Sequence, residues 1–329
     1  MTRERTHVDI SVVICTYNRS HGLERVLGHL AEQKPPSGLE WEILAIDNNS
    51  TDGTPETVRR FAREHPRLVV RYVFERTQGL SFARNRAVGE ARGELLAFTD
   101  DDVLIDGGWL AAIGDILPRR EFLGFGGKVI PQMPHDIPGW LVLKGPFALN
   151  KGGVIVSHDL GNEFKKYAEK DPRPVGANLI FRRSAFERFG LFRTDLGKRG
   201  DQIFFGEDVE FSARIEAGGA GMLYVPHAIV YHPVESARLT KRVFRQYYYQ
   251  IGRARATLNR YPSHAVRYWG IPRHLFRKLA VRVGKAALAV AMLRRERWFY
   301  YELDIRSLVA ELIGCYGIRS HGSRNRSDM

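Results

Sequence analysis

Three consecutive carboxylates follow an apolar run in this chain, because Leu95–Thr99 leads directly into Asp100, Asp101 and Asp102. Adjacent unpaired carboxylates repel one another and are costly to remove from water. A hard divalent cation bound together with a phosphate would cancel that repulsion at the end of a buried strand. A solvated acidic turn has the same sequence, so the run indicates a metal-assisted phosphate site that needs support from other residues.

Two further polar clusters follow apolar runs of the same kind. The first is Thr16, Tyr17 and Asn18, and the second is Asp47–Ser50. A carboxylate such as Asp47 at a strand end can accept hydrogen bonds from a nucleobase or a ribose hydroxyl, and the ring of Tyr17 can pack against a base. The second cluster is equally compatible with a turn that caps a helix.

Three more side chains can complete such a site. Arg84 lies where a helix is predicted to open, and backbone N–H groups and a guanidinium can meet a pyrophosphate there. Asp208 lies at the predicted start of another helix, where an ionised carboxylate can accept a proton from an attacking hydroxyl. His232 follows an apolar run and can add an imidazole to a metal held by Asp102. The competing interpretations are a surface ion pair, a helix cap and a structural histidine.

The elements that position these residues follow from the apolar pattern. Four apolar runs rich in β-branched residues alternate with helical stretches, which predicts an α/β, Rossmann-like, mostly parallel sheet with helices on both faces. In such sheets ligands bind beyond the carboxyl ends of the strands, where the polar clusters fall. The sequence contains neither a Gly-x-Gly-x-x-Gly turn nor a Gly-x-x-x-x-Gly-Lys-Ser/Thr loop. The runs are residues 10–15, 41–46, 69–74 and 95–99.

The chain then continues with shorter elements. A strand is predicted over residues 175–181, and a helix from Glu207 to Arg214 that ends at a Gly-Gly pair. Two short apolar runs, residues 222–225 and 228–231, precede His232.

Composition and charge limit the class of protein. The 329 residues are 44% hydrophobic and 26% charged, which is typical of a globular protein. The two cysteines lack metal or disulfide spacing and the first residues lack a signal-peptide pattern, so we expect a cytoplasmic setting. Residues 233–329 hold 20 Lys and Arg against 6 Asp and Glu, whereas residues 1–232 hold 30 against 31. The cationic extension predicts a membrane leaflet, a nucleic acid or an anionic polymer as partner.

Residues 271–293 have the pattern of a basic amphipathic helix. Apolar residues recur at steps of three and four on one predicted face, and basic residues fall largely on the other. With nearby aromatic residues, this helix suits a membrane interface; packing on the body of the protein with a solvated basic face is the alternative. The apolar positions are Leu275, Leu279, Val283, Ala286, Val290 and Leu293, and the basic ones are Arg273, Arg277, Lys278 and Lys285.

Taken together, five motifs resemble those of glycosyltransferase family 2 and occur in that family's order over about residues 9–235. The resemblance implies a GT-A fold and inverting transfer of a sugar from a nucleotide donor, usually a uridine diphosphate sugar, with Mn2+ or Mg2+. The motifs are Val-Val-Ile-Cys-Thr-Tyr-Asn-Arg, Ile-Asp-Asn-Asn-Ser-Thr-Asp-Gly-Thr, Gly-Leu-Ser-Phe-Ala-Arg-Asn, Thr-Asp-Asp-Asp and Gly-Glu-Asp-Val-Glu.

The resemblance also implies roles for single residues. Asp47 would meet the base, Asp100 the ribose or the metal, Asp102 the metal, and Asp208 would be the general base. The segment that begins at Val175 would be the strand on the acceptor side. The expected site comprises Asp208 as catalytic residue; Thr16, Tyr17, Asn18, Asp47, Arg84, Asp100 and Asp101 as donor-binding residues; Asp102 and His232 as metal ligands; and Gly176, Ala177, Asn178 and Glu207 as acceptor-binding residues.

The expected domain organisation follows from the extent of the motifs. We expect a GT-A glycosyltransferase domain over residues 1–235, with a donor half at about 9–102 and an acceptor and catalytic half at about 103–235. A basic, amphipathic helical extension follows over residues 236–329.

One departure from the family bears on the product. Processive polysaccharide synthases of this family carry Gln-x-x-Arg-Trp and several transmembrane helices, whereas here Gln250-Ile-Gly-Arg253 is followed by Ala254. We therefore expect addition of one sugar. The basic extension favours a peripheral enzyme on the inner face of the cytoplasmic membrane, with a lipid-linked oligosaccharide acceptor in cell-surface polysaccharide biosynthesis. This acceptor rests partly on family analogy, and a soluble acceptor stays open.

Two other classes of function compete with sugar transfer. A nucleotidyltransferase can use a similar carboxylate set, but it needs a Gly-rich basic loop that residues 16–20 do not supply. A non-enzymatic nucleic-acid-binding protein would account for the basic extension but leaves Asp100–Asp102 and Asp208 unexplained. Sugar transfer accounts for all of these residues, so we expect no nucleic acid partner.

Overall fold

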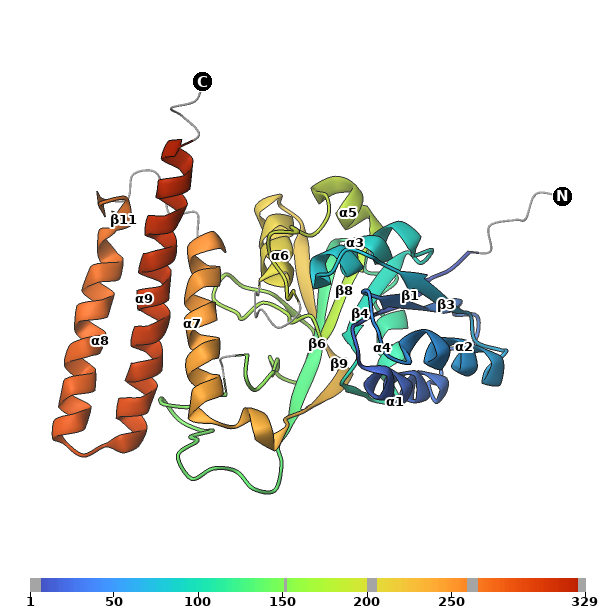
Figure 1. The fold of residues 1–329 in the computed structure, drawn as a ribbon. Coiled ribbons are helices and arrows are strands. Elements are labelled where there is room, and N and C mark those ends of the chain that lie inside the picture. Colours follow the sequence, from blue (N-terminus) through green and yellow to red (C-terminus); the bar gives the residue numbers. More distant parts are fainter. Residues whose placement is uncertain (1–6, 151–152, 200–205, 259–265, 325–329) are drawn as a thin grey trace. The chain divides into compact units, whose positions relative to one another are not determined.

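The computed structural model describes residues 7–150, 153–199, 206–258 and 266–324 (Figure 1). These residues form two compact units, one built on a large sheet and the other on three long helices. The sheet unit comprises the described residues of Met1–Gln132, Ser157–Gln202 and Glu207–Pro233, and the helical unit comprises those of Met133–Val156, Ile203–Gly206 and Val234–Met329.

The predicted parallel start of the sheet is confirmed. Four strands pair in parallel in the order β3-β2-β1-β4, and each begins and ends within one residue of its predicted run. A helix follows each of the first three strands, as the alternation of patterns requires. The strands are β1 (Ile10–Thr16), β2 (Trp41–Asp47), β3 (Val70–Phe74) and β4 (Leu95–Asp100), and the helices are α1 (Ser20–Ala31), α2 (Thr54–Glu64) and α3 (Leu80–Glu90).

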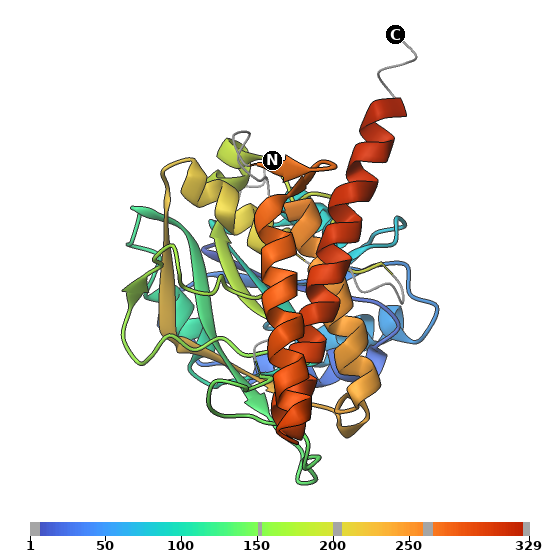
Figure 2. The same cartoon turned by 90° about the vertical axis from the view of Figure 1, so that its left-hand side faces the viewer.

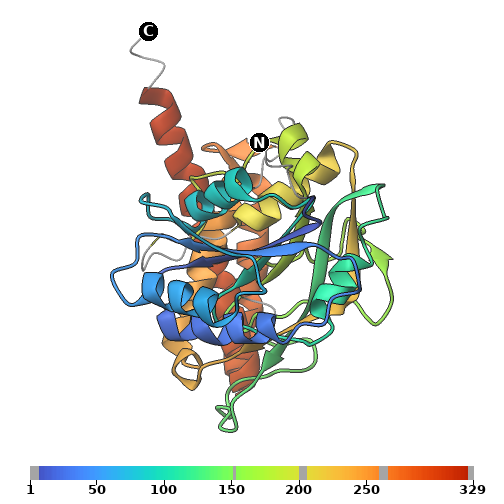
Figure 3. The same ribbon diagram turned by 90° about the vertical axis from the view of Figure 1, so that its right-hand side faces the viewer.

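The helices cover both faces of this sheet. Figure 3 shows α1 and α2 on one face and α3 on the other. In α1, four apolar side chains at steps of three and four are buried, so one stripe of the helix packs on the strands. Because strands β1, β2 and β4 have apolar partners on both sides, they are almost wholly buried.

The second half of the sheet contains antiparallel pairs. β8 (Asn178–Arg182) lies antiparallel between β4 and β6 (Phe122–Gln132), and β9 (Gly221–Pro233) runs parallel to β6. The short strands β5 (Leu104–Ile105) and β7 (Lys165–Lys166) pair with β9. Among the described residues the sheet therefore has nine strands.

Two strand predictions in this half were wrong in detail. The two apolar runs of residues 222–225 and 228–231 belong to a single strand, β9, whose register against β6 shifts between Gly127 and Lys128. Such an irregularity bends a strand without ending it. The strand predicted from residue 175 begins only at Asn178, because Gly176 and Ala177 form a turn.

Three helices complete the sheet unit: α4 (Trp109–Gly114), α5 (Arg183–Phe189) and α6 (Glu207–Ala217). Phe211 of α6 packs edge-on against Phe181 of β8 and stacks on Phe186 of α5, with ring centroids 4.8 and 4.7 Å apart. Such aromatic pairs add to the free energy gained by burial. They hold α6, whose first residues were predicted to carry the catalytic base, against the sheet.

The helical unit consists mainly of α7 (Lys241–Leu258), α8 (Arg273–Ala291) and α9 (Arg295–Arg324). α9 packs against both α7 and α8, and Figure 2 shows α8 and α9 side by side. Phe244, Phe299 and Leu303 form its buried core. A two-residue hairpin, β10 (Arg267–Tyr268) and β11 (Ile271–Pro272), precedes α8. Over the described part of the chain, every helix is too short or too polar to span a bilayer.

The helix predicted over residues 271–293 is confirmed as α8, but its predicted apolar face is only partly correct. Leu275 is buried and Leu279 packs against the same cluster. Val283, Val290 and Leu293 are exposed instead. Apolar residues lie on more than one side of this helix, so periodicity alone does not select the side that packs.

Candidate active site

The polar clusters that follow the parallel strands meet at one edge of the sheet, as expected for carboxyl ends of parallel strands. Thr16 lies opposite Asp47 in the register of β1 and β2, and Cys15 lies opposite Asp100 in that of β1 and β4. The Thr16 hydroxyl donates a hydrogen bond of 2.7 Å to Asp101. The side chains predicted to bind the donor therefore converge from three strands.

Asp100, Asp102 and His232 form a cluster whose potential ligand atoms all lie within 4.8 Å of one another. His232 Nε2 lies 3.7 Å from Asp102 Oδ1, and Nδ1 lies 3.1 Å from the carbonyl oxygen of Pro233. A carbonyl only accepts, so Nδ1 carries the proton in this contact, and Nε2 is the ring nitrogen that faces the two carboxylates. Such an outer contact orients an imidazole for a metal.

The electrostatics of this edge favour a bound cation. Burial raises the pKa of Asp100, and the charge of Asp102 raises it further. Burial also raises the pKa of Asp101 to about 7, although Arg19 and the hydrogen bond from Thr16 oppose this shift. Two carboxylates and an imidazole are suitable ligands for a divalent metal, and a cation would remove the repulsion between the acids. Asp100, Asp102 and His232 can therefore bind a metal ion.

Arg19 is a residue of this edge to which the sequence analysis gave no role. Its Nη1 lies 3.3 Å from Asp101 Oδ1 and also forms an ion pair with Asp102. The Arg19 side chain is 43% exposed, so its guanidinium can also reach a phosphate. The sequence could have indicated a role for Arg19, because it directly follows Thr16, Tyr17 and Asn18, the first polar cluster.

The region predicted to hold the nucleobase is preorganised by local contacts. Asp47 is buried and accepts hydrogen bonds of 2.8 Å from the Ser50 N–H and from the Tyr72 hydroxyl. Asn18 adopts a left-handed φ of 51°, and its Oδ1 accepts a hydrogen bond of 2.7 Å from the Thr51 N–H. Tyr17 beside it is exposed and available to a base. The nucleobase roles of Asp47 and Tyr17 stay predictions.

Arg84 and Glu207 form an ion pair that is almost completely buried. Burial raises the pKa of Glu207 to about 7, whereas the charge of Arg84 lowers it. The guanidinium also lies 5.8 Å from the centroid of the Phe192 ring. In this structure the charge of Arg84 is directed at Glu207, so the pyrophosphate contact of Arg84 and the acceptor contact of Glu207 both stay predictions.

Asp208, the predicted base, is held by two backbone groups. Its Oδ2 accepts a hydrogen bond of 2.9 Å from Gly176 N–H, and its Oδ1 accepts one of 2.8 Å from Val209 N–H. The pKa of Asp100 is raised mainly by burial and then by the charge of Asp102, and the charge of Asp208 makes a smaller contribution in the same direction. The carboxylate therefore lies within electrostatic range of the metal cluster. A β-carbon on Gly176 would lie 2.1 Å from Arg84 Nη2, so any other residue here would displace the Arg84 guanidinium.

The acceptor-side segment contributes backbone rather than side chains. Gly176 binds Asp208, and the Ala177 carbonyl accepts a hydrogen bond from Thr99. Asn178 is fully buried, and its amide pairs with Trp109 and with the carbonyls of Lys128 and Ala228. In this structure Asn178 holds β8 to its neighbours, and its predicted acceptor contact would need that network to open.

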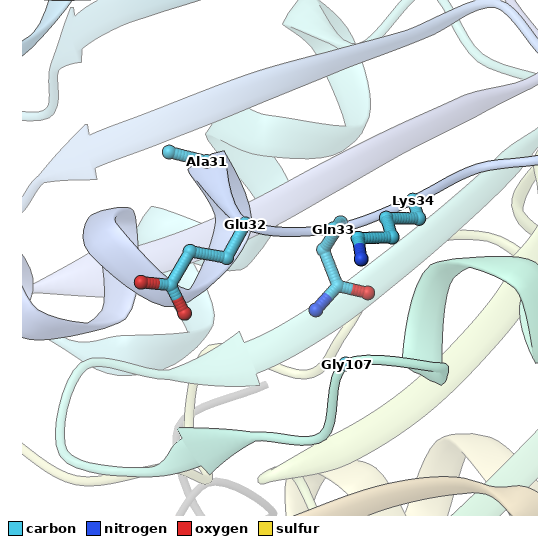
Figure 4. A pocket seen from close by; sticks show the side chains of 5 residues that line it. All are labelled: Ala31, Glu32, Gln33, Lys34 and Gly107. Carbon is cyan, nitrogen blue, oxygen red and sulfur yellow. The ribbon is translucent and has the colours of Figure 1, made fainter.

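One open cavity of about 740 Å³ lies away from this edge (Figure 4). It is lined by Ala31, the last residue of α1, by the three residues that follow it, and by Gly107. α1 begins next to the site and is roughly 18 Å long, so the cavity lies at the far end of the helix. Gln33 in its wall uses its amide to bind Asp106 and Leu110 backbone groups. This cavity includes none of the predicted site residues.

The buried Arg84–Glu207 pair gives a stability prediction. Arg84→Met should lower the free energy of unfolding by about 3–5 kcal/mol, because it leaves Glu207 buried without a counter-ion. Glu207→Gln added to Arg84→Met should recover much of that loss. Urea unfolding measures both. The control is Arg63→Met, which removes an exposed pair with Glu56 and should cost about 0–1 kcal/mol. Equal effects of the two arginine substitutions would show that the Arg84 pair is solvated.

The fold and this edge define a class of protein. The protein has a Rossmann-like sheet with a cluster of two acids and an imidazole at its carboxyl edge. A separate carboxylate, Asp208, lies within electrostatic range of that cluster. This is the arrangement of a GT-A transferase. The model of the glycosyl transferase family 2 matches residues 11–190, and the chain belongs to this family. It is therefore a glycosyltransferase, and of the three classes considered from the sequence, sugar transfer is the correct one.

Relatives and solved structures agree with this assignment. The chain is 26% identical over 337 residues to the succinoglycan biosynthesis protein ExoM of Rhizobium meliloti (strain 1021), covering 98% of each chain. It is 25% identical over 230 residues to the glucosyl-dolichyl phosphate glucuronosyltransferase of Haloferax volcanii, covering 68% of each. The mannosyltransferase PcManGT from Pyrobaculum calidifontis, in complex with GDP-Man and Mn2+, has the same fold. Its TM-score is 0.59 at 22% identity, covering 94% of this chain and 88% of that one.

Proposed function

We propose that this protein transfers one sugar from a nucleotide-sugar donor to an acceptor hydroxyl with inversion at the anomeric carbon. The observation that carries the proposal is the Asp208 carboxylate, fixed by Gly176 N–H within electrostatic range of the Asp100, Asp102 and His232 cluster. A base and a leaving-group site in one place are what a single displacement requires.

The proposed reaction is a single displacement. Asp208 accepts the proton of the acceptor hydroxyl as its oxygen forms a bond to the anomeric carbon. The bond from that carbon to the diphosphate oxygen breaks on the opposite face, so the configuration inverts and a nucleoside diphosphate leaves. Asp100, Asp102 and His232 would hold a divalent cation, which would supply charge neutralisation for the departing diphosphate. Arg19, beside these acids, adds a guanidinium for the same phosphates.

We propose Mn2+ or Mg2+ as this cation and a uridine diphosphate sugar as the donor. The donor set of carboxylate oxygens with one imidazole suits Mn2+, and the complex of PcManGT with GDP-Man and Mn2+ supports a metal at this edge. We propose that the base is bound by Asp47, the last residue of β2, and by Tyr17, which follows β1.

We propose a lipid-linked oligosaccharide as the acceptor, in the biosynthesis of a cell-surface polysaccharide. The names of two relatives support this, since one acts in succinoglycan biosynthesis and the other on a glucosyl-dolichyl phosphate. Ala254, where processive synthases have tryptophan, supports addition of one sugar. Such an acceptor places the enzyme at the inner face of the cytoplasmic membrane, bound peripherally.

The test is calorimetric titration of the purified chain with uridine diphosphate and with guanosine diphosphate, each in Mn2+ and in chelator. Guanosine diphosphate is included because PcManGT was solved with GDP-Man. We expect tight binding of one nucleotide only, and only with Mn2+. Binding that is equal with metal and with chelator would contradict the metal role, and binding of neither nucleotide would contradict the proposed donor.

A further inference from the structure

Two bulky apolar residues occupy strained turns at the two ends of α8. Trp269 has a φ of 51° and is 74% exposed, and Leu293 has a φ of 52° and is 86% exposed. The left-handed region is unfavourable for bulky side chains, and glycine or asparagine is usual there. The fold thus keeps a strained backbone at two positions and gains little burial from either side chain. Strain of this kind concentrates where it serves a function.

The face of α8 between these two turns is also apolar and uncovered. Phe276, Val283 and Val290 follow one another at steps of seven residues and so form a row along the helix. Val283 and Val290 are both at least half exposed. The Trp269 ring lies 6.4 Å from that of Phe276, so the turn residue continues this row. Val281 and Leu288 are exposed as well, about 160° round the helix from Val283 and Val290. Exposed Ala280, Gly284 and Ala287 lie between the two pairs. The opposite side of α8, with Leu275 and Ala289, is buried.

Basic side chains surround this face. From Arg273 to Arg297 the sequence has eight Lys or Arg and a single Glu. Arg273 and Arg277 at one end of α8, and Lys285 and Arg294 toward the other, are exposed. The surface therefore offers apolar side chains and positive charge along the whole helix, about 28 Å by the rise per residue.

The combination of exposed apolar side chains and positive charge distinguishes between possible partners of this surface of α8. A second copy placed symmetrically on α8 would bring its basic ends against the basic ends of the first. A nucleic acid would neutralise the charge but leave the exposed valines and leucines in water. An anionic lipid leaflet accepts both, because apolar side chains enter the acyl boundary while Lys and Arg contact the headgroups.

We propose that α8 and its two turns dock in the interface of an anionic membrane leaflet, with the helix axis parallel to the membrane. The docking surface comprises Trp269, Val281, Val283, Leu288, Val290 and Leu293. This inference deepens the proposed function, on which it rests for a lipid-linked acceptor, by naming the surface that meets the lipid.

The first experiment is co-sedimentation of the full chain with phosphatidylglycerol–phosphatidylcholine vesicles and with phosphatidylcholine vesicles. We expect salt-sensitive binding to the anionic vesicles and little to the neutral ones. Arg277→Gln with Lys285→Gln should lower partitioning into anionic vesicles by roughly tenfold or more. Equal sedimentation with and without vesicles would overturn the proposal.

The turn residues give a second, independent variant. Trp269→Asn with Leu293→Asn should keep or raise the melting temperature, since asparagine tolerates the left-handed region, while vesicle partitioning falls by about tenfold or more. A purely structural role for these side chains predicts a lower melting temperature instead. Leu191→Asn, which changes a half-exposed leucine of the sheet unit, is the control and should leave partitioning unchanged.

Other occupants appear as distinct outcomes. A dimer in sedimentation velocity that the asparagine variant dissolves, or oligonucleotide binding with the same variant dependence, would replace the membrane by that partner. Nucleotide calorimetry without vesicles separates this inference from the proposed function. Lost vesicle binding with intact metal-dependent nucleotide binding overturns the docking surface alone, and the reverse result overturns the transfer proposal alone.

Discussion

Replacement of Asp208 by asparagine is expected to reduce sugar transfer by about 10²- to 10⁴-fold, the usual contribution of a general base. Asparagine keeps the size of the side chain but cannot take up the proton of an attacking hydroxyl. Its carbonyl can keep the hydrogen bond from either Gly176 or Val209, so the stability loss should be about 1 kcal/mol. Nucleotide affinity should change little, because the metal cluster is untouched.

The measurement is release of nucleoside diphosphate from sugar donors that carry the nucleotide identified by calorimetry. A bacterial membrane lipid extract serves as the acceptor. The matched control is Glu210→Gln, half a turn further along α6, which removes a surface ion pair with Arg214. We expect near wild-type transfer from the control. If the two variants transferred at the same rate, Asp208 would be a helix-start carboxylate and the base would lie elsewhere.

The parts of the site that could be predicted are those fixed by strand periodicity. β1, β2 and β4 were predictable because apolar, β-branched runs of five to seven residues leave few other conformations. Once three parallel strands are adjacent, Thr16, Asp47 and Asp100 must meet at one edge. His232 was predictable for the same reason, because it lies at the end of β9.

The contacts that could not be predicted join distant segments. Nothing local to Asn178 shows that Trp109 and the Lys128 carbonyl will surround its amide. Likewise Arg84 pairs with a glutamate 123 residues away, so its charge is directed into the protein. A motif shows which residue types are present. The direction of each side chain depends on contacts with elements that lie far away in the sequence.

The exposed face of α8 shows the same limit for a helix. A period of 3.6 residues predicts that a helix forms, and α8 does form. It does not decide which side packs when apolar residues occur all round, and α9 covers only the side of Leu275 and Ala289. The strained turns at Trp269 and Leu293 were beyond sequence reasoning, since their residue types argue against a left-handed φ.

Asp102→Ala is expected to remove the response to metal without weakening the metal-free fold. In the metal-free chain the charge of Asp102, after burial, raises the pKa of Asp100, so its removal relieves repulsion. Arg19 keeps Asp101 as a partner. The melting temperature without metal should therefore stay the same or rise. Metal affinity should fall by about 100-fold or more, because even changes in outer contacts cost about 10- to 100-fold.

Thermal unfolding with and without Mn2+ separates these effects, because a ligand that binds only the folded chain stabilises it by an amount that rises with the ratio of ligand concentration to Kd. Wild type and the control Asp115→Ala, which removes an exposed acid beyond α4, should both gain stability from Mn2+. Asp102→Ala should gain almost none, and its nucleotide binding should no longer depend on metal. If Asp102→Ala gained as much stability from Mn2+ as wild type, Asp102 would not be a metal ligand. Arg19 would then offset the repulsion among the three acids, and arginine alone would have to neutralise the diphosphate.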